Sequence, residues 1–323
     1  MSTHFRNCAL ATLLSLSLSA QAATITIVNN DGPDEGFNDP TPVMSVGGNP
    51  GTTLGQQRLL VFQRAADIWG ARLQSDVEIR VQANFDSLTC SASSATLGSA
   101  GPTTTHVVAS ESPYLLPAAL ANARTRRDLN GGRAEIVARF NSDIDQGCLA
   151  PGREWWYGFN RAAGGDRRFA LLPVVLHELA HGLGFTAMID FRTSRFPMNV
   201  PSQFGALILD LGAAQWFAYM SPSEITAAST NDPNLVWVGL NVRLQFEDLL
   251  QTNPATGLPW GTTSRLVRLH APAGLAPGSS VSHFSTAARP DLLMEPVITP
   301  GLFDQLDLTP ALLQDIGWDL MGP

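Results

Sequence analysis

The pentapeptide His177-Glu178-Leu179-Ala180-His181 constrains this 323-residue chain more than any other stretch. On a helix, residues four positions apart lie on the same face, so two imidazoles at this spacing can reach one ion. The glutamate beside the first histidine is placed to take a proton from a metal-bound water. The pattern therefore predicts a helix that carries two zinc ligands, His177 and His181, and a general base, Glu178.

The residues on both sides of the pentapeptide support this helix. Residues 169–176 form an apolar run, and Pro173 is tolerated if the helix begins near Leu172. Gly182 and Gly184 follow the second histidine and supply a stop. The alternative is an ordinary buried helix whose two histidines bind no metal.

The first 22 residues have the features of a secretory signal peptide. Arg6 gives a positive start, residues 9–18 are mostly apolar, and Ala20-Gln21-Ala22 matches a small-x-small cleavage site. A retained anchor is the alternative, but this run is too short to span a bilayer and no later segment is long enough. We expect export to the periplasm or the medium, without attachment to a membrane.

Charge narrows the set of partners. The formal net charge is −8, and it becomes −9 when the segment with Arg6 is removed. This balance argues against nucleic acid or an anionic membrane as a partner. Nothing in the sequence indicates an oligomeric state.

Two cysteines, Cys90 and Cys148, remain beyond the signal segment. An even pair in an oxidising compartment favours a disulfide bond between them. Two free, buried thiols are the alternative.

Strand-like and helix-like segments alternate before the pentapeptide, and this mixture predicts an α+β fold. Alternating apolar residues predict strands at 24–28, 77–81, 105–109 and 134–140, the last at a sheet edge. Helical spacing or capping residues predict helices at 54–73, 117–128, 204–220, from Ser221 onward, and 309–316. A further short strand is expected at 236–238.

Residues 29–50 read as a loop that contains four acidic side chains, Asp31, Asp34, Glu35 and Asp39. Carboxylates of this kind could hold a structural calcium ion (Ca²⁺), although they do not follow EF-hand spacing. A solvated loop without a metal is the alternative.

A catalytic zinc ion (Zn²⁺) usually takes three protein ligands and leaves a fourth position for water. Three other histidines remain, namely His106, His270 and His283. We favour His283, and a glutamate ligand is the main competing arrangement.

Taken together, these motifs resemble the leishmanolysin-like metzincins, a family of zinc proteases. The shared features are His177-Glu178-x-x-His181-x-x-Gly184-Phe185, a distant His283, and Met294 within Leu292-Leu293-Met294-Glu295-Pro296. Most metzincins carry the third histidine at the position of Ala187, whereas leishmanolysin-like enzymes insert a segment before it. The resemblance implies that Gly184 turns the chain sharply and that Met294 forms an apolar floor under the metal.

The resemblance also implies a zincin-like layout of the chain. The expected segments are a signal peptide (1–22), an N-terminal subdomain (23–184), an insertion that forms a cleft wall (185–282) and a C-terminal subdomain (283–323). Some relatives have a tyrosine just after the methionine turn to assist the oxyanion, but residues 295–300 hold none.

These features predict a secreted zinc endopeptidase that acts on proteins or peptides. A secreted binding or adhesion protein with a structural zinc ion, and a zinc amidase acting on cell wall, remain as alternatives.

Overall fold

The structure is a computed structural model that describes residues 21–161, 167–299 and 301–322. The expected signal peptide lies outside the described residues, apart from Gln21 and Ala22. Within the described ranges, no helix combines the length and the apolar character needed to cross a membrane.

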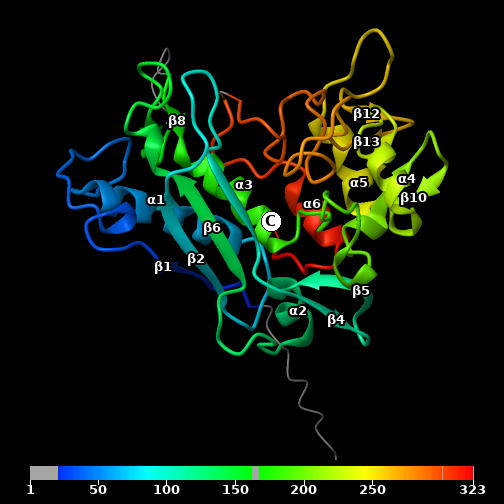
Figure 1. Ribbon diagram of the computed structural model, residues 1–323, viewed down its shortest axis with the longest axis horizontal. Coiled ribbons are helices and arrows are strands. Elements are labelled where there is room, and N and C mark those ends of the chain that lie inside the picture. The colour runs from blue at the N-terminus through cyan, green and yellow to red at the C-terminus, as the bar shows by residue number, and fades with distance from the viewer. Residues whose placement is uncertain (1–20, 162–166, 300, 323) are drawn as a thin grey trace, which may run out of the picture.

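A four-stranded mixed sheet organises the first half of the chain (Figure 1). Its order is β1 (Ile25–Asn29), β2 (Ile79–Asp86), β6 (Ile136–Asn141) and β3 (Gly98–Pro102). β1, β2 and β6 are parallel, whereas β3 runs antiparallel to β6. Alternate residues of β2 are buried, as expected for a strand with one face against the core. β3 therefore forms an edge of the sheet.

Two helices, α1 (Leu54–Gly70) and α3 (Leu171–Leu183), pack against each other and against this sheet. Phe62 of α1 packs edge-on against Phe140 of β6, with ring centroids 4.7 Å apart. The indole N–H of Trp69 donates a hydrogen bond to the carbonyl of Leu176 over 3.0 Å. These buried contacts fix α3 on the sheet.

The remaining elements surround this core. A hairpin of β4 (Thr105–Val108) and β5 (Ser112–Pro117) leads into α2 (Ala118–Thr125), and β7 (Trp155–Trp156) pairs with β8 (Phe169–Ala170). The later elements are β9 (Ile208–Asp210), β10 (Gln215–Trp216), α4 (Pro222–Ala228), β11 (Leu235–Trp237), α5 (Leu240–Leu249), β12 (Thr262–Thr263), β13 (Leu266–Val267) and α6 (Thr309–Asp315). Short 3-10 turns lie at Gly36–Asn38, Ser142–Ile144, Pro197–Asn199, Gly205–Leu207 and Phe217–Tyr219.

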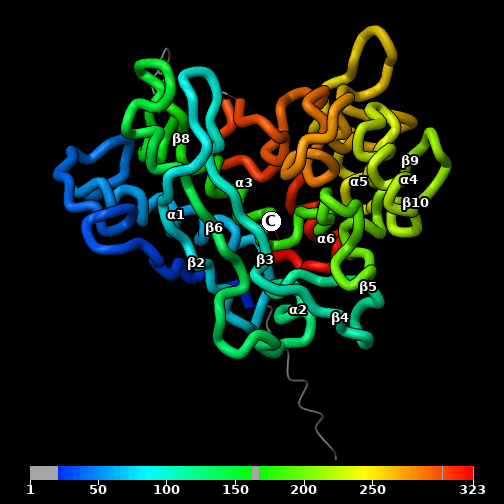
Figure 2. The backbone as a smooth tube through the Cα atoms, in the orientation of Figure 1, coloured from blue at the N-terminus to red at the C-terminus, as the bar shows by residue number. Residues whose placement is uncertain are grey.

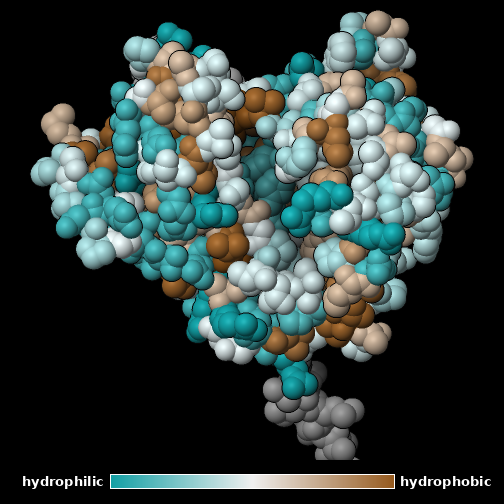
Figure 3. Space-filling view, in the orientation of Figure 1, coloured by the Kyte–Doolittle hydropathy of each residue, from teal (hydrophilic) through white to brown (hydrophobic). Residues whose placement is uncertain are grey.

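The chain forms two halves that the C-terminal segment joins, as the tube in Figure 2 shows. The sheet half is blue to green, and the half with α4, α5 and β9–β13 is yellow to orange. The last residues, in red, return to the sheet half, where the N–H of Gln74 donates to the carbonyl of Asp319 over 2.9 Å. Figure 3 shows a recess between the halves.

The α+β prediction is confirmed, and most predicted elements form within a few residues of the expected bounds. Two predictions are wrong. The strand predicted at 134–140 lies inside the sheet, because β3, a Gly-Ser-Ala-Gly-Pro segment with low strand propensity, covers its free side. Residues 204–220 form no α-helix, because the Asp210 carboxylate accepts hydrogen bonds from the N–H groups of Gly212 and Ala213 and closes a turn between β9 and β10.

Candidate metal centre

Helix α3 carries His177, Glu178 and His181 on its buried length, and glycines set its position and its end. A Cβ atom at residue 182 would overlap the side chain of Ile136 in β6, so Gly182 permits close packing of the helix on the sheet. Gly184 has a φ of 124°, which a residue with a side chain rarely adopts, and it ends the helix. The helix stop predicted from Gly184 is thus present.

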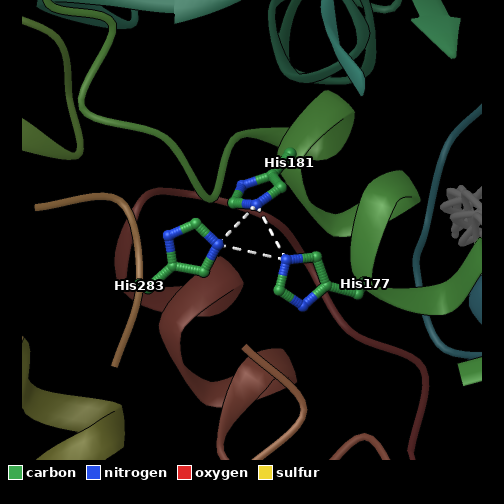
Figure 4. Close-up of side chains that lie close together, drawn as sticks. All are labelled: His177, His181 and His283. Atoms are coloured by element: carbon green, nitrogen blue, oxygen red, sulfur yellow. Dashed lines mark hydrogen bonds between the residues drawn. The ribbon is translucent and has the colours of Figure 1, made fainter. Parts of the chain in front are cut away.

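The second half of the molecule brings His283 to the two histidines of α3 (Figure 4). The Nε2 atom of His283 lies 3.1 Å from that of His177 and 3.2 Å from that of His181. The Nε2 atoms of His177 and His181 are 3.0 Å apart. All three side chains are at most 8% exposed. Across the described residues, this is the one group of three or more potential metal ligands gathered at a point.

Backbone carbonyls hold the other nitrogen of each ring. The Nδ1 atoms of His177, His181 and His283 lie 2.7, 2.7 and 2.8 Å from carbonyl oxygens. The acceptors are Leu293, Phe185 and Ser279, respectively. A carbonyl can only accept a hydrogen bond, so each Nδ1 carries the proton and each Nε2 presents a lone pair.

Burial also keeps the three rings neutral. It lowers the pKa of His177 to about 4 and that of His181 to about 3, and it lowers the pKa of His283 well below its usual value. Three facing lone pairs cannot form hydrogen bonds to one another, whereas a cation between them would satisfy all three.

The spacing of the nitrogens fits a transition-metal ion. A triangle with sides of about 3.1 Å has its centre about 1.8 Å from each corner, and zinc binds imidazole nitrogen at about 2.0–2.1 Å. The three nitrogens would hold such an ion, and they supply three of the four ligands that zinc commonly takes. The buried triad can therefore hold a metal ion, and its donor set is compatible with zinc.

Glu178 lies beside the triad and contacts the edge strand of the sheet. The N–H of Ala100 in β3 lies near its carboxylate and favours the ionised form. A Cβ atom at Gly98 would lie 3.2 Å from the Cγ of Glu178, so this glycine lets β3 approach the carboxylate closely. Burial raises the pKa of Glu178 to about 8, and a cation held by the histidines would lower it again.

The three histidines and Glu178 open into one cleft with a volume of about 670 Å³. Residues 93–100 form one wall, which includes the start of β3. Val174, Phe169 and residues 295–298 line another part, and residues 277–279 complete the rim. Small side chains dominate the first wall.

The segment that contains Met294 supports two of the histidines. Met294 is fully buried, and its carbonyl accepts a hydrogen bond from the N–H of Phe284, next to His283, over 2.8 Å. The preceding carbonyl, of Leu293, is the one that binds the ring of His177. Met294 thus belongs to a turn that contacts both His177 and the backbone next to His283.

Other residues singled out from the sequence lie elsewhere. His106 lies in β4 and His270 lies outside the triad, so neither joins it. No described tyrosine lines the cleft, and the oxyanion helper stays unassigned.

The predicted disulfide bond, Cys90–Cys148, is present and spans 58 residues. Cys90 precedes the first cleft wall, and Cys148 precedes Leu149, another residue that lines the cleft. The disulfide therefore links two segments that border the cleft. The calcium prediction gains no support from the acidic loop, because Asp31 accepts hydrogen bonds from the N–H groups of Phe37 and Phe85 and Glu35 accepts one from Gly32.

Sequence reasoning missed two features of the centre. One is β3, whose composition hides a strand. The other is Asp307, whose carboxylate accepts a hydrogen bond from the N–H of Leu293 over 2.5 Å. No sequence signal links Asp307 to the methionine turn, because the two contacting residues are 14 positions apart.

Comparisons with protein-family models, with curated proteins and with solved structures gave no significant match.

Proposed function

We propose that this protein is an exported zinc-dependent endopeptidase of the metzincin type, with a leishmanolysin-like order of ligands. The observation that carries the proposal is the convergence of three imidazole lone pairs at a cleft, beside a carboxylate and next to an open strand edge. A structural zinc site would offer four protein ligands, whereas the described residues gather three.

His177, His181 and His283 would hold the ion. Bound there, zinc supplies Lewis acidity that acidifies water and polarises a peptide carbonyl. Glu178 takes a proton at its carboxylate from the attacking water and delivers it to the leaving amine. The N–H of Ala100, on the edge strand that borders the cleft, lies near that carboxylate.

The free edge of β3 could bind an extended peptide as an additional strand. The carbonyl of Leu97 and the N–H of Thr103, at the two ends of β3, form hydrogen bonds toward the β6 side. Antiparallel pairing alternates along a strand, so the backbone groups of Gly98 and Ala100 face away from β6. The Ala100 N–H lies near Glu178, and the backbone groups of Gly98 and the carbonyl of Ala100 would pair with a substrate strand.

The edge also has a defined end. Pro102 is the last residue of β3 and has no N–H to offer. The pairing surface is therefore short and lies directly beside the carboxylate of Glu178, which suits alignment of one scissile bond.

A digest of casein by the purified protein tests the proposal. We expect cleavage that a chelator abolishes and added zinc restores. Glu178→Gln should retain the metal and lose about 10²–10⁴-fold in turnover, because the proton acceptor is gone. His283→Ala should lose metal or activity, whereas His270→Ala, a matched histidine outside the triad, should lose neither.

Two outcomes would reject the endopeptidase proposal. Zinc-loaded protein that leaves casein and other peptides intact would favour a structural metal in a binding protein. Release of fragments from isolated cell wall, with casein untouched, would favour an amidase.

A further inference from the structure

A turn at residues 292–295 connects the metal centre to the last helix. Its first N–H, of Leu292, donates to the side chain of Glu295 over 2.9 Å. Its second N–H, of Leu293, donates to the carboxylate of Asp307 over 2.5 Å. Two acidic side chains thus hold the amide groups of this turn.

The carbonyls of the same turn hold the ligands. The carbonyl of Leu293 accepts the Nδ1 proton of His177 over 2.7 Å, and that of Met294 accepts the N–H of Phe284 over 2.8 Å. A shift of the turn would therefore rotate the ring of His177 and displace the backbone next to His283. Hydrogen bonds to the second nitrogen of a metal-binding histidine fix its tautomer and orientation.

Asp307 is well placed to hold that turn. Its carboxylate also accepts a hydrogen bond over 3.2 Å from the Thr309 hydroxyl, and the N–H groups of Leu308 and Thr309 lie near it. These contacts anchor it to the start of α6, whose residues Ala311–Leu313 are fully buried. The contacts therefore run from the buried helix α6, through Asp307 and Leu293, to the imidazole of His177.

We propose that Asp307 is a positioning residue for the metal centre, acting on His177 through the N–H and the carbonyl of Leu293. The proposal rests on the metal centre and not on the choice of substrate. It assigns a role in metal binding to a side chain 130 positions from the ligand that it positions, as the two residue numbers show.

Metal affinity measured by competition with a chelator tests this role without any substrate. Burial raises the pKa of Asp307 to about 7, so the measurements belong at pH 8, where the carboxylate is ionised. We expect Asp307→Ala to weaken zinc binding by about 10–100-fold, the usual effect of losing such a partner. The visible spectrum of the cobalt-substituted protein should change with it.

Asp315→Ala is the matched control. Asp315 is the last residue of α6, the helix that Asp307 precedes, and both residues are partly exposed. Its carboxylate accepts hydrogen bonds from the N–H groups of Asn241 and Val242 and from the indole of Trp237. It is a comparable anchor without a link to a ligand. Its removal should lower stability but leave zinc affinity within about threefold of wild type, well short of the loss expected for a ligand-orienting partner.

Asp307→Asn keeps the test decisive if the alanine variant does not fold. The amide oxygen can still accept from Leu293, but the bond loses its charge and weakens. We expect the Nδ1 proton resonance of His177 to move, while that of His181, which bonds to Phe185, stays in place. Wild-type zinc affinity in folded Asp307→Ala, or an unmoved His177 resonance in Asp307→Asn, would overturn the proposal. A wild-type protein that binds zinc but cleaves no peptide would instead count against the proposed function, and it would leave this test of Asp307 unaffected.

Discussion

Replacing His283 with leucine should change stability in opposite directions with and without zinc. In the metal-free protein, three buried acceptors face one another, and a buried acceptor without a donor costs about 1–3 kcal/mol. Removing one of them relieves that cost. The ring also gives up its hydrogen bond to Ser279, worth about 0.5–1.5 kcal/mol. The metal-free variant should therefore be as stable as wild type, or more stable by up to about 2 kcal/mol.

Zinc reverses this order. At a free zinc concentration 100 times the dissociation constant, the wild-type protein gains about 2.7 kcal/mol from binding. The variant keeps two ligands and should gain far less. Urea unfolding with a chelator and with buffered zinc measures both differences. His270→Leu is the control, because its partly buried histidine lies outside the triad and the variant should gain as much from zinc as wild type.

Two results would refute this reasoning. Equal stabilisation of wild type and His283→Leu by zinc would mean that His283 does not bind the ion. A loss of about 3 kcal/mol or more in the metal-free variant is the cost of an ordinary buried cavity. It would mean that the three rings do not present facing acceptors that lack donors.

Three further predictions concern the scaffold of the site. The double variant Cys90→Ser, Cys148→Ser should lower the free energy of unfolding by about 4 kcal/mol, the loop-closure value for 58 residues. Urea unfolding measures this change, and an unchanged free energy would contradict the prediction. A methyl group at residue 182 would overlap Ile136. The effects of Gly182→Ala and Ile136→Ala on the free energy of unfolding should therefore differ from additivity by about 1–3 kcal/mol in a double-mutant cycle. Additive effects would count against close packing at this contact. Met294→Leu should cost less than about 1.5 kcal/mol and leave zinc affinity within about threefold in a chelator competition, because the residue packs in the core; loss of the metal would show a more direct role.

The local part of the centre was predictable from the sequence. Helix α3, its two histidines and Glu178 depend on residues a few positions apart, and helical geometry alone places them on one face. Gly184 was predictable for the same reason, because a helix end commonly requires a positive φ. The disulfide followed from the number of cysteines and the expected compartment.

The long-range part was not predictable from local rules. His283 lies 102 positions from His181, and no local spacing rule links the two. The need for a third ligand and the sequence around His283 favour it over His106 and His270, and the resemblance agrees. β3 was not predicted, because its glycines and proline weaken the sequence pattern of a strand. It forms a strand because β6 supplies its hydrogen bonds. The apolar run at 204–220 predicts a helix, and apolar content alone does not reveal the turn at Asp210.

X-ray absorption at the zinc edge of the purified protein tests the metal centre most directly. We predict one bound zinc with three imidazole nitrogens at about 2.0–2.1 Å and one exchangeable oxygen. His283→Leu should reduce the imidazole count by one. A fourth protein ligand, a sulfur ligand, or an unchanged spectrum in that variant would contradict the centre described above.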